Sequence, residues 1–401
     1  MVLEEKVSGE QVFGNPLFYY NIATFLYFCV AGVISTFYYP FLTQQVGLNL
    51  VQVSRVTSFG AGFSLIVQPL LSHLFSRSKN KKRFIISYLG SLLVLCVLFL
   101  LVRQEWIYWF AVAYGCVGVP LIGTYEIYIE KIADHRGFSY AKIRKWGSVG
   151  MGCLTLTGGT ILSLFSFQGL HLLGIFLLCV CILIIWRKFA DVRTADRNKK
   201  IRFSENFKNK NVCVLYLMSF LGIGSYVGCD FAFSSYLTQI VGDVNLSNQL
   251  FSFSTGMKIF SEFLCFLVIG KFFQNYNVKK TFLMVFVFSG LRFLCISTGI
   301  VPIVILGDLL HAIVFPLFLT VIFQYLHLMT QSRLVSGCYG IVSMLMFGFS
   351  NFIFPPIFSG IQAAFGYEMI YRVNVGIALV TVLIGGKFLP STTGKSESDS
   401  K

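Results

Sequence analysis

Charged residues are scarce in this sequence. Asp, Glu, Lys and Arg make up 12% of its 401 residues, whereas hydrophobic residues make up 56%, and the mean hydropathy is +0.74. A soluble domain of this size could not cover so much apolar side chain with polar surface. The composition therefore excludes an ordinary soluble protein and indicates a chain that lies in a lipid bilayer.

Several signatures of chemistry are also missing. No glycine-rich phosphate loop is present, which argues against an ATP-driven pump. The eleven cysteines are scattered, and only Cys179 and Cys181 lie close together, so no spacing suits zinc or an iron–sulfur cluster. The charged residues form no nucleophile and base pair. We therefore expect no enzyme, no metal and no cofactor, and an ion or substrate gradient as the energy source.

Long uncharged runs dominate what is present. In hydrocarbon each backbone polar group must be paired within its own segment, so runs of about 20 residues indicate spanning helices. The first run follows a short leader with Glu4, Glu5 and Glu10 and no cleavage signature, so we expect it to be retained. The sequence predicts an all-α polytopic membrane protein with twelve transmembrane helices. The runs are 17–42, 51–75, 84–102, 106–129, 146–166, 169–186, 212–240, 248–273, 281–299, 301–327, 335–360 and 366–386.

Basic residues give the chain a net charge of +15 at pH 7. They gather in short loops after the even-numbered runs, which is the pattern of topology signals and not of a nucleic-acid surface. The positive-inside rule then predicts that both termini are cytoplasmic, in a cell (inner or cytoplasmic) membrane. These loop residues include Arg77, Lys79, Lys81, Lys82, Arg83, Lys131, Arg136, Lys142, Arg144, Lys145, Lys271, Lys279 and Lys280.

The longest polar stretch, from Arg187 to Lys210, carries nine Lys or Arg residues. It predicts an N-terminal six-helix bundle at 1–190, a cytoplasmic linker at 191–210, a C-terminal six-helix bundle at 211–390 and a disordered tail at 391–401. Transporters built from two such bundles bind substrate between them at the membrane midplane.

Ionisable residues inside the apolar runs are the candidates for function, because each costs about 2.5–3.5 kcal/mol at a helix centre. Three pairs share a helix face: Glu126 with Glu130, Lys258 with Glu262, and Asp308 with His311. The alternative is that such residues only neutralise one another and join helices. The candidates are Glu126, Glu130, Arg144, Asp230, Lys258, Glu262, Arg292, Asp308 and His311.

One block resembles a known family. TYEIYIEK followed by SYAKIRKWGSVGM, which ends at Met151, is similar to the lactose permease branch of the oligosaccharide:proton symporters in the major facilitator superfamily. FSLIVQPL at 63–70, Asp230, Arg292, and His311 with Pro316 extend the resemblance to both halves. It implies the major facilitator fold and proton-coupled sugar transport.

The resemblance also implies site residues. Glu126 and Arg144 would pair and hydrogen-bond sugar hydroxyls, with Ser148 and Met151 on the face of Arg144. A guanidinium and a carboxylate at a dry midplane can each make two directed bonds to adjacent hydroxyls. The proton-coupling residues would be Asp308, His311, Arg292, Glu262, Asp230 and Lys258.

The sequence departs from the family at four positions. Ser72 and Ser76 stand where the loop motif has glycine and aspartate, Met151 replaces the tryptophan that stacks on the sugar, and Val314 replaces the proton-carrying carboxylate. Asp308 ranks first as the substitute acid, since it shares a face with His311 and can approach Arg292. Glu262 is expected to pair with Lys258.

The sequence therefore predicts a proton-coupled importer of a di- or oligosaccharide that works by alternating access. Its partners would be a small-molecule sugar, protons and the lipid bilayer, with no nucleic acid, and we expect a monomer. A carrier for a nucleoside or an aromatic acid, and an uncoupled facilitator, are the alternatives within transport. A non-transporting sensor or scaffold on the same fold is the alternative outside it.

Overall fold

The computed structural model describes residues 16–189, 206–207, 209–272 and 277–390. Within these ranges the chain is helical and has no strand, and nine helical stretches are long and apolar enough to cross a membrane. One of the nine, α7 (Tyr140–Lys188), contains two helices joined by a kink at Ser166, so the nine hold ten predicted spans. The helices α11 and α12 lie at the other two predicted places. The predicted all-α polytopic membrane fold is confirmed.

The first group of helices precedes the predicted linker. It consists of α1 (Pro16–Thr36), α2 (Tyr38–Pro40), η1 (Phe41–Gln45), α3 (Leu50–Arg77), α4 (Lys81–Leu101), η2 (Gln104–Trp106), α5 (Ile107–Ala113), η3 (Tyr114–Gly118), α6 (Leu121–Arg136) and α7.

The second group follows that linker. It consists of α8 (Lys210–Met218), η5 (Ser219–Gly224), α9 (Ser225–Gly228), η6 (Asp230–Ala232), α10 (Phe233–Val241), α11 (Val244–Phe272), α12 (Val278–Ile296), α13 (Val301–Leu309), α14 (His311–Met329), α15 (Ser332–Ser343), η7 (Met344–Phe349), α16 (Ser350–Phe365) and α17 (Tyr367–Phe388).

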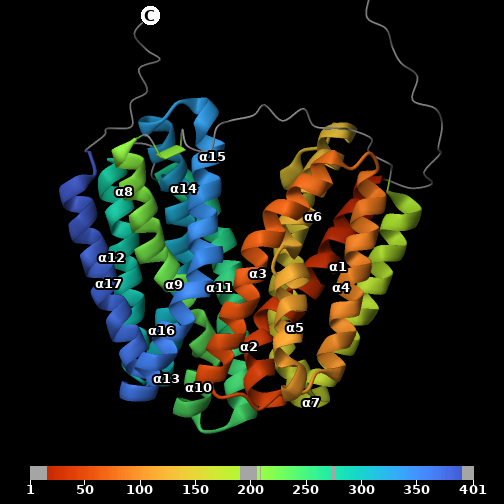
Figure 1. Cartoon of the computed structure of the whole chain (residues 1–401), viewed down its shortest axis with the longest axis horizontal. Helices are drawn as coiled ribbons and strands as arrows, with labels where there is room; N and C mark the ends of the chain where they lie inside the picture. Colours follow the sequence, from red (N-terminus) through yellow and green to blue (C-terminus); the bar gives the residue numbers. More distant parts are fainter. Residues whose placement is uncertain (1–15, 190–205, 208, 273–276, 391–401) are drawn as a thin grey trace, which may run out of the picture.

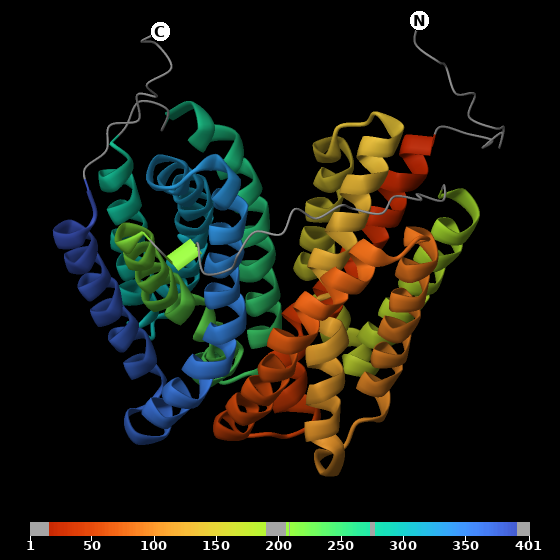
Figure 2. The same cartoon turned by 45° about the horizontal axis from the view of Figure 1, so that its top comes forward.

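The two groups stand side by side, close together at the lower end of Figure 1 and apart at the upper end. The helix α1 begins and α17 ends at the upper end (Figure 2). The side of the membrane on which this end lies, and the division into two bundles, stay predictions. The predicted linker 191–210 falls almost wholly outside the described residues, and the predicted tail 391–401 falls outside them altogether.

Neutral polar contacts join the two groups at the lower end, which we call the closed end. The side-chain amides of Gln44 and Asn248 exchange two hydrogen bonds of 2.8 Å each. The Gly159 N–H on α7 donates to Ser252 Oγ on α11 at 2.7 Å. A third contact joins α3 and α16, where Ser54 and Ser359 share a hydrogen bond of 2.8 Å.

The helices α3 and α16 separate toward the upper end. Ser58 Oγ still donates to the Asn351 carbonyl at 3.4 Å, but further along α3 a cavity of about 290 Å³ lies between Gln68 and Ser72 on α3 and Ser343 on α15. The chain therefore has one closed end and one open end, which is the arrangement that alternating access requires of a single state.

Small residues let α1 and α7 approach closely. A Cβ at Gly150 would collide with the carbonyl of Phe25, and one at Gly147 would collide with the ring of Phe28. Cys29 Sγ donates to the Gly150 carbonyl at 3.3 Å. The segment GSVGMG at 147–152 therefore packs closely against α1 beside Arg144.

Four predicted runs contain breaks instead of continuous helix. The breaks lie at Phe37 in the first run, Val119 and Pro120 in the fourth, Cys229 in the seventh and Leu310 in the tenth. The separate runs 146–166 and 169–186 are the two helices of α7, which meet at Ser166 with its left-handed φ of 59°. Hydropathy could not show the four breaks, because a break and a regular turn can have the same apolar composition.

The basic loop residues also stabilise helix ends. Lys81 is buried, and its Nζ donates to the carbonyls of Phe75 at 2.5 Å and Ser76 at 2.8 Å. Lys82 Nζ donates to the Phe189 carbonyl at 2.7 Å. In the second group, Lys279 Nζ donates to the carbonyls at 386 and 389, at 2.8 and 2.6 Å. The last carbonyls of a helix lack partners and carry partial negative charge, so an ammonium there is favourable.

Candidate functional site

Glu126 on α6 and Arg144 on α7 form an ion pair in the first group. Arg144 Nε donates to Glu126 Oε1 at 2.6 Å, and Arg144 Nη1 donates to Ser148 Oγ at 3.2 Å. Ser148 lies one turn after Arg144, as its predicted place on the same face requires. The expected pairing of Glu126 with Arg144 is present, and the role of these residues in binding stays a prediction.

The aromatic ring of Phe28 supports this pair. The Arg144 guanidinium carbon lies 4.4 Å from the ring centroid, which is a cation–π distance. The side chains of Arg144 and Glu126 are 30% and 31% exposed. Sequence reasoning missed Phe28, because nothing distinguishes it among 43 phenylalanines. The pair is therefore held in place but open to a ligand.

Met151 lies further along α7 and packs against α1. A Cβ at Gly32 would be 3.4 Å from the Met151 carbonyl oxygen and 3.7 Å from its Cγ. Trp146 is 38% exposed and lies near Lys145. The role of Met151 beside the substrate stays a prediction.

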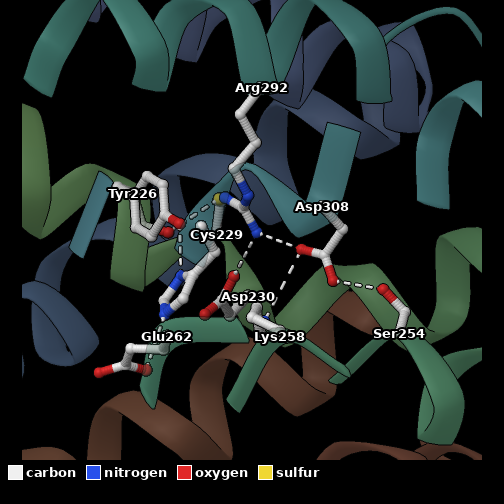
Figure 3. Close-up of polar contacts among 9 residues, drawn as sticks. Tyr226, Cys229, Asp230, Ser254, Lys258, Glu262, Arg292 and Asp308 are labelled. Carbon is white, nitrogen blue, oxygen red and sulfur yellow. Dashed lines mark hydrogen bonds and ion pairs between the residues drawn. The ribbon is translucent and has the colours of Figure 1, made fainter. Parts of the chain in front are cut away.

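A second cluster lies in the second group and has a buried ion pair at its centre (Figure 3). Arg292 Nη2 on α12 donates to Asp308 Oδ1 on α13 at 2.7 Å, and their side chains are 1% and 0% exposed. Ser254 Oγ on α11 donates to the other Asp308 oxygen at 2.7 Å. Lys258 Nζ lies 3.7 Å from Asp308 Oδ1. The predicted approach of Asp308 to Arg292 is confirmed.

Asp230 reaches the same guanidinium from the break in the seventh run. Its Oδ1 lies 3.5 Å from Arg292 Nη2, and its side chain is 38% exposed. The Arg292 guanidinium carbon lies 4.3 Å from the centroid of the Tyr226 ring. Figure 3 shows Arg292 between Tyr226 and Asp308, with Asp230 nearby. Arg292 is therefore held between two carboxylates and an aromatic face.

Glu262 and His311 form the third part of this cluster. His311 Nε2 lies 3.7 Å from Glu262 Oε2, and His311 Nδ1 shares a hydrogen bond of 2.5 Å with the Tyr226 hydroxyl. The prediction that Glu262 pairs with Lys258 is wrong: Lys258 contacts Asp308, and Glu262 contacts His311. Residues four apart on a helix are neighbours, but a partner on another helix can hold a buried charge better.

All six residues predicted for coupling come together in this cluster, although they belong to five elements. Two of the helix breaks place Asp230 and His311 at helix ends beside it. The sequence analysis missed Ser254 and Tyr226, yet each lies four residues before a residue that it named, Lys258 and Asp230. The i, i+4 spacing was thus a usable signal for both.

Two further observations complete the description of the site. Val314 is fully buried in the hydrophobic core, so its place offers no titratable group. Among the described residues, no set of three His, Cys, Asp or Glu side chains could hold a metal ion.

Comparisons of the sequence give one family and several relatives. Residues 17–372 match the profile of the MFS_1 like family. The sucrose permease of Escherichia coli is 24% identical over 276 residues, which cover 67% of this chain and 66% of that protein. The raffinose permease of Escherichia coli is 29% identical over 148 residues, 35% of each chain. The melibiose permease of Enterobacter cloacae is 25% identical over 37% of each chain. The chain thus spans just under two thirds of the first relative and about a third of the others.

Solved structures show the same fold at lower identity. The nucleoside transporter NupG superposes with a TM-score of 0.80 at 16% identity, covering 94% of this chain and 99% of that one. A bacterial homologue of the human lysosomal transporter Spinster gives a TM-score of 0.68 at 15% identity, covering 94% and 97%. At these identities the likeness concerns the fold alone.

Proposed function

The chain belongs to the MFS_1 like family of membrane transporters, and on that premise we propose that it imports a di- or oligosaccharide together with protons by alternating access. The sugar permeases among its relatives support the substrate class. Rocking of one helix group against the other would open the closed end and close the open one.

The observation that carries the proposal is the exposed Glu126–Arg144 pair above Phe28. A carboxylate accepts hydrogen bonds from sugar hydroxyls, and a planar guanidinium donates to two adjacent oxygens. A ligand with vicinal hydroxyls can therefore engage both members of the pair at once, with Ser148 beside them.

For coupling, we place the exchangeable proton on Glu262 and not on Asp308, which the sequence ranked first. Asp308 neutralises two cations in a buried position. Protonating it would leave Asp230 as the one carboxylate among the described residues that faces Arg292 and Lys258, and removing one partner of a buried pair costs about 3–5 kcal/mol. Glu262 is 23% exposed and contacts His311, which connects to Tyr226. A partly accessible acid beside a histidine can gain and lose a proton as the conformation changes.

The test is the external pH of weakly buffered, de-energised cells that express the protein. We expect alkalinisation when sucrose, raffinose or melibiose is added, because inward sugar flux would carry protons with it. Glu126→Gln and Arg144→Lys should each reduce this response at least about tenfold, since each removes a directed bond worth about 1.4 kcal/mol or more to the bound sugar.

The matched control is Glu130→Gln. Glu130 lies one turn after Glu126 on α6 and is exposed, so this variant should retain the response. No pH change with any sugar, despite protein in the membrane, would contradict proton-coupled sugar import. Uptake of labelled sugar without a pH change would indicate an uncoupled facilitator. Uptake of uridine or of an aromatic acid instead would establish one of the other carriers.

A further inference from the structure

A cavity of about 130 Å³ lies between the two helix groups on the closed-end side of the charged cluster. Ser35 and Thr36 of α1 and Tyr39 of α2 line it from the first group. Asp230, Thr255 and Lys258 line it from the second. Since a cavity of roughly 10–15 Å³ already holds one water molecule, this cavity is large enough for a ligand group of many atoms. The proposed contacts of Glu126 and Arg144 do not use it.

The polar groups around this cavity have unused hydrogen-bonding capacity. Asp230 is 38% exposed, and only its Oδ1 contacts Arg292, at 3.5 Å. Thr255 Oγ1 is buried without a hydrogen-bond partner among the described residues. A buried hydroxyl without a partner costs about 1–3 kcal/mol, so a ligand that draws the Thr255 hydroxyl round into the cavity and bonds it gains that energy.

The charges around the cavity select a neutral ligand. Lys258 and Arg292 are balanced by Asp230 and Asp308 through contacts of 2.7 to 3.7 Å. A ligand with a net charge would upset this balance in a poorly solvated place. A hydroxyl, by contrast, can donate to Asp230 and accept from Lys258 without changing the charge. The chemistry that fits is a neutral ring with several hydroxyls.

The position of the cavity sets the length of the ligand. Phe28, which supports Arg144, and Thr36, which lines the cavity, are eight residues apart on α1. At a rise of 1.5 Å per residue this is about 12 Å along the helix axis. One sugar ring does not span that distance, so a molecule that reaches both places has at least two rings.

We propose that this cavity is a subsite for a distal ring of an oligosaccharide whose first ring is held by Glu126 and Arg144. The inference rests on the proposed function and adds to it a cause for chain-length preference. Phe233 and Phe251 complete the lining and offer apolar surface to the C–H face of a ring.

The experiment measures binding of a series of sugars of increasing length to the purified protein. The series is methyl α-galactoside, melibiose and raffinose, which have one, two and three rings. Thr255→Leu fills the cavity and removes its hydroxyl. We expect the dissociation constant of raffinose to rise about tenfold, which corresponds to about 1.4 kcal/mol, while that of the single-ring sugar stays unchanged.

Two variants make the result interpretable. Thr157→Leu makes the same chemical change at an exposed position of α7 and should leave all three sugars unaffected. Tyr39→Phe removes only one hydroxyl from the cavity, and it should weaken raffinose selectively even if Thr255→Leu does not fold. The subsite would be overturned if a cavity variant weakened the binding of all three sugars equally. It would also be overturned if neither Thr255→Leu nor Tyr39→Phe weakened the binding of any of them. Failure of the unmodified protein to bind any sugar would instead overturn the proposed function.

Discussion

Arg292 and Asp308 form the most deeply buried ion pair among the described residues. Replacing either residue alone by an apolar one would leave the charge of the other without its partner. Arg292 contacts two carboxylates and the Tyr226 ring, and Asp308 contacts Arg292, Lys258 and Ser254. Glu126 and Arg144 have the same chemistry, but both are about a third exposed. Burial therefore separates a pair that stabilises the cluster from a pair that can bind a ligand.

At this scale we predict that Asp308→Asn destabilises the protein by about 3–5 kcal/mol, because it leaves two buried cations short of a counter-charge. Glu262→Gln should cost much less, because Glu262 is partly exposed and its ion-pair partner among the described residues is His311 at 3.7 Å. The measurement is the thermal unfolding midpoint of each purified variant in detergent. The ranking of Asp308 as proton carrier would be restored if Asp308→Asn unfolded like the parent protein but transported sugar without protons.

A companion prediction concerns coupling itself. Glu262→Gln cannot release a proton, so sugar uptake should lose its dependence on external pH while counterflow of sugar across equilibrated vesicles continues. Exchange of labelled for unlabelled sugar in proteoliposomes at two pH values measures both. A pH dependence equal to that of the parent would exclude Glu262 as the carrier.

Breaks in four helices are the main feature at the scale of elements. They fall in the first, fourth, seventh and tenth spans, which are the first of each successive set of three. Transporters with internal repeats of three helices place binding sites at such discontinuous helices. Here the breaks in the first and seventh spans lie next to Tyr39 and Asp230, which line the cavity between the two groups, and the break in the tenth span directly precedes His311.

Lysines cap corresponding helices in the two groups. Lys82, which follows the second span, donates to the Phe189 carbonyl at the end of α7, and Lys279, which follows the eighth span, donates to the carbonyl at 386 near the end of α17. We predict that Lys279→Met lowers the free energy of unfolding by about 0.3–1 kcal/mol, because the last carbonyls of α17 lose an ammonium partner. Thermal unfolding in detergent checks this. Lys280→Met is the control, since Lys280 is the exposed neighbour of Lys279. Equal effects of the two substitutions would show that only net charge matters.

At the scale of the whole molecule, neutral contacts hold the closed end. Gln44 and Asn248 bond through their amides, the Gln249 amide donates to Ser163 Oγ, and the contacts Ser54–Ser359 and Gly159–Ser252 use hydroxyl and backbone groups. Neutral hydrogen bonds contribute about 0.5–1.5 kcal/mol each. Such a closure can open when a ligand binds one conformation only slightly better than the other.

We therefore predict that linking this end stops transport. Gln44→Cys with Asn248→Cys, joined by a short bifunctional thiol reagent, should abolish sugar uptake, while the double variant without reagent keeps it. Mass spectrometry verifies the link, and Gln44→Cys alone with the same reagent is the control for the native cysteines. Undiminished uptake by fully linked protein would show that this end does not open during transport.

The sequence determined the number and nature of the helices, because hydrocarbon leaves the backbone no partner outside its own segment. The Glu126–Arg144 contact was expected from the resemblance to the lactose permease branch, and the short turn between α6 and α7 brings the two residues together. The tertiary structure alone decided where four helices break and which charges pair. Lys258 contacts Asp308 instead of Glu262, because the strength of a buried charge pair depends on which helices pack together, and spacing along one helix does not contain that information.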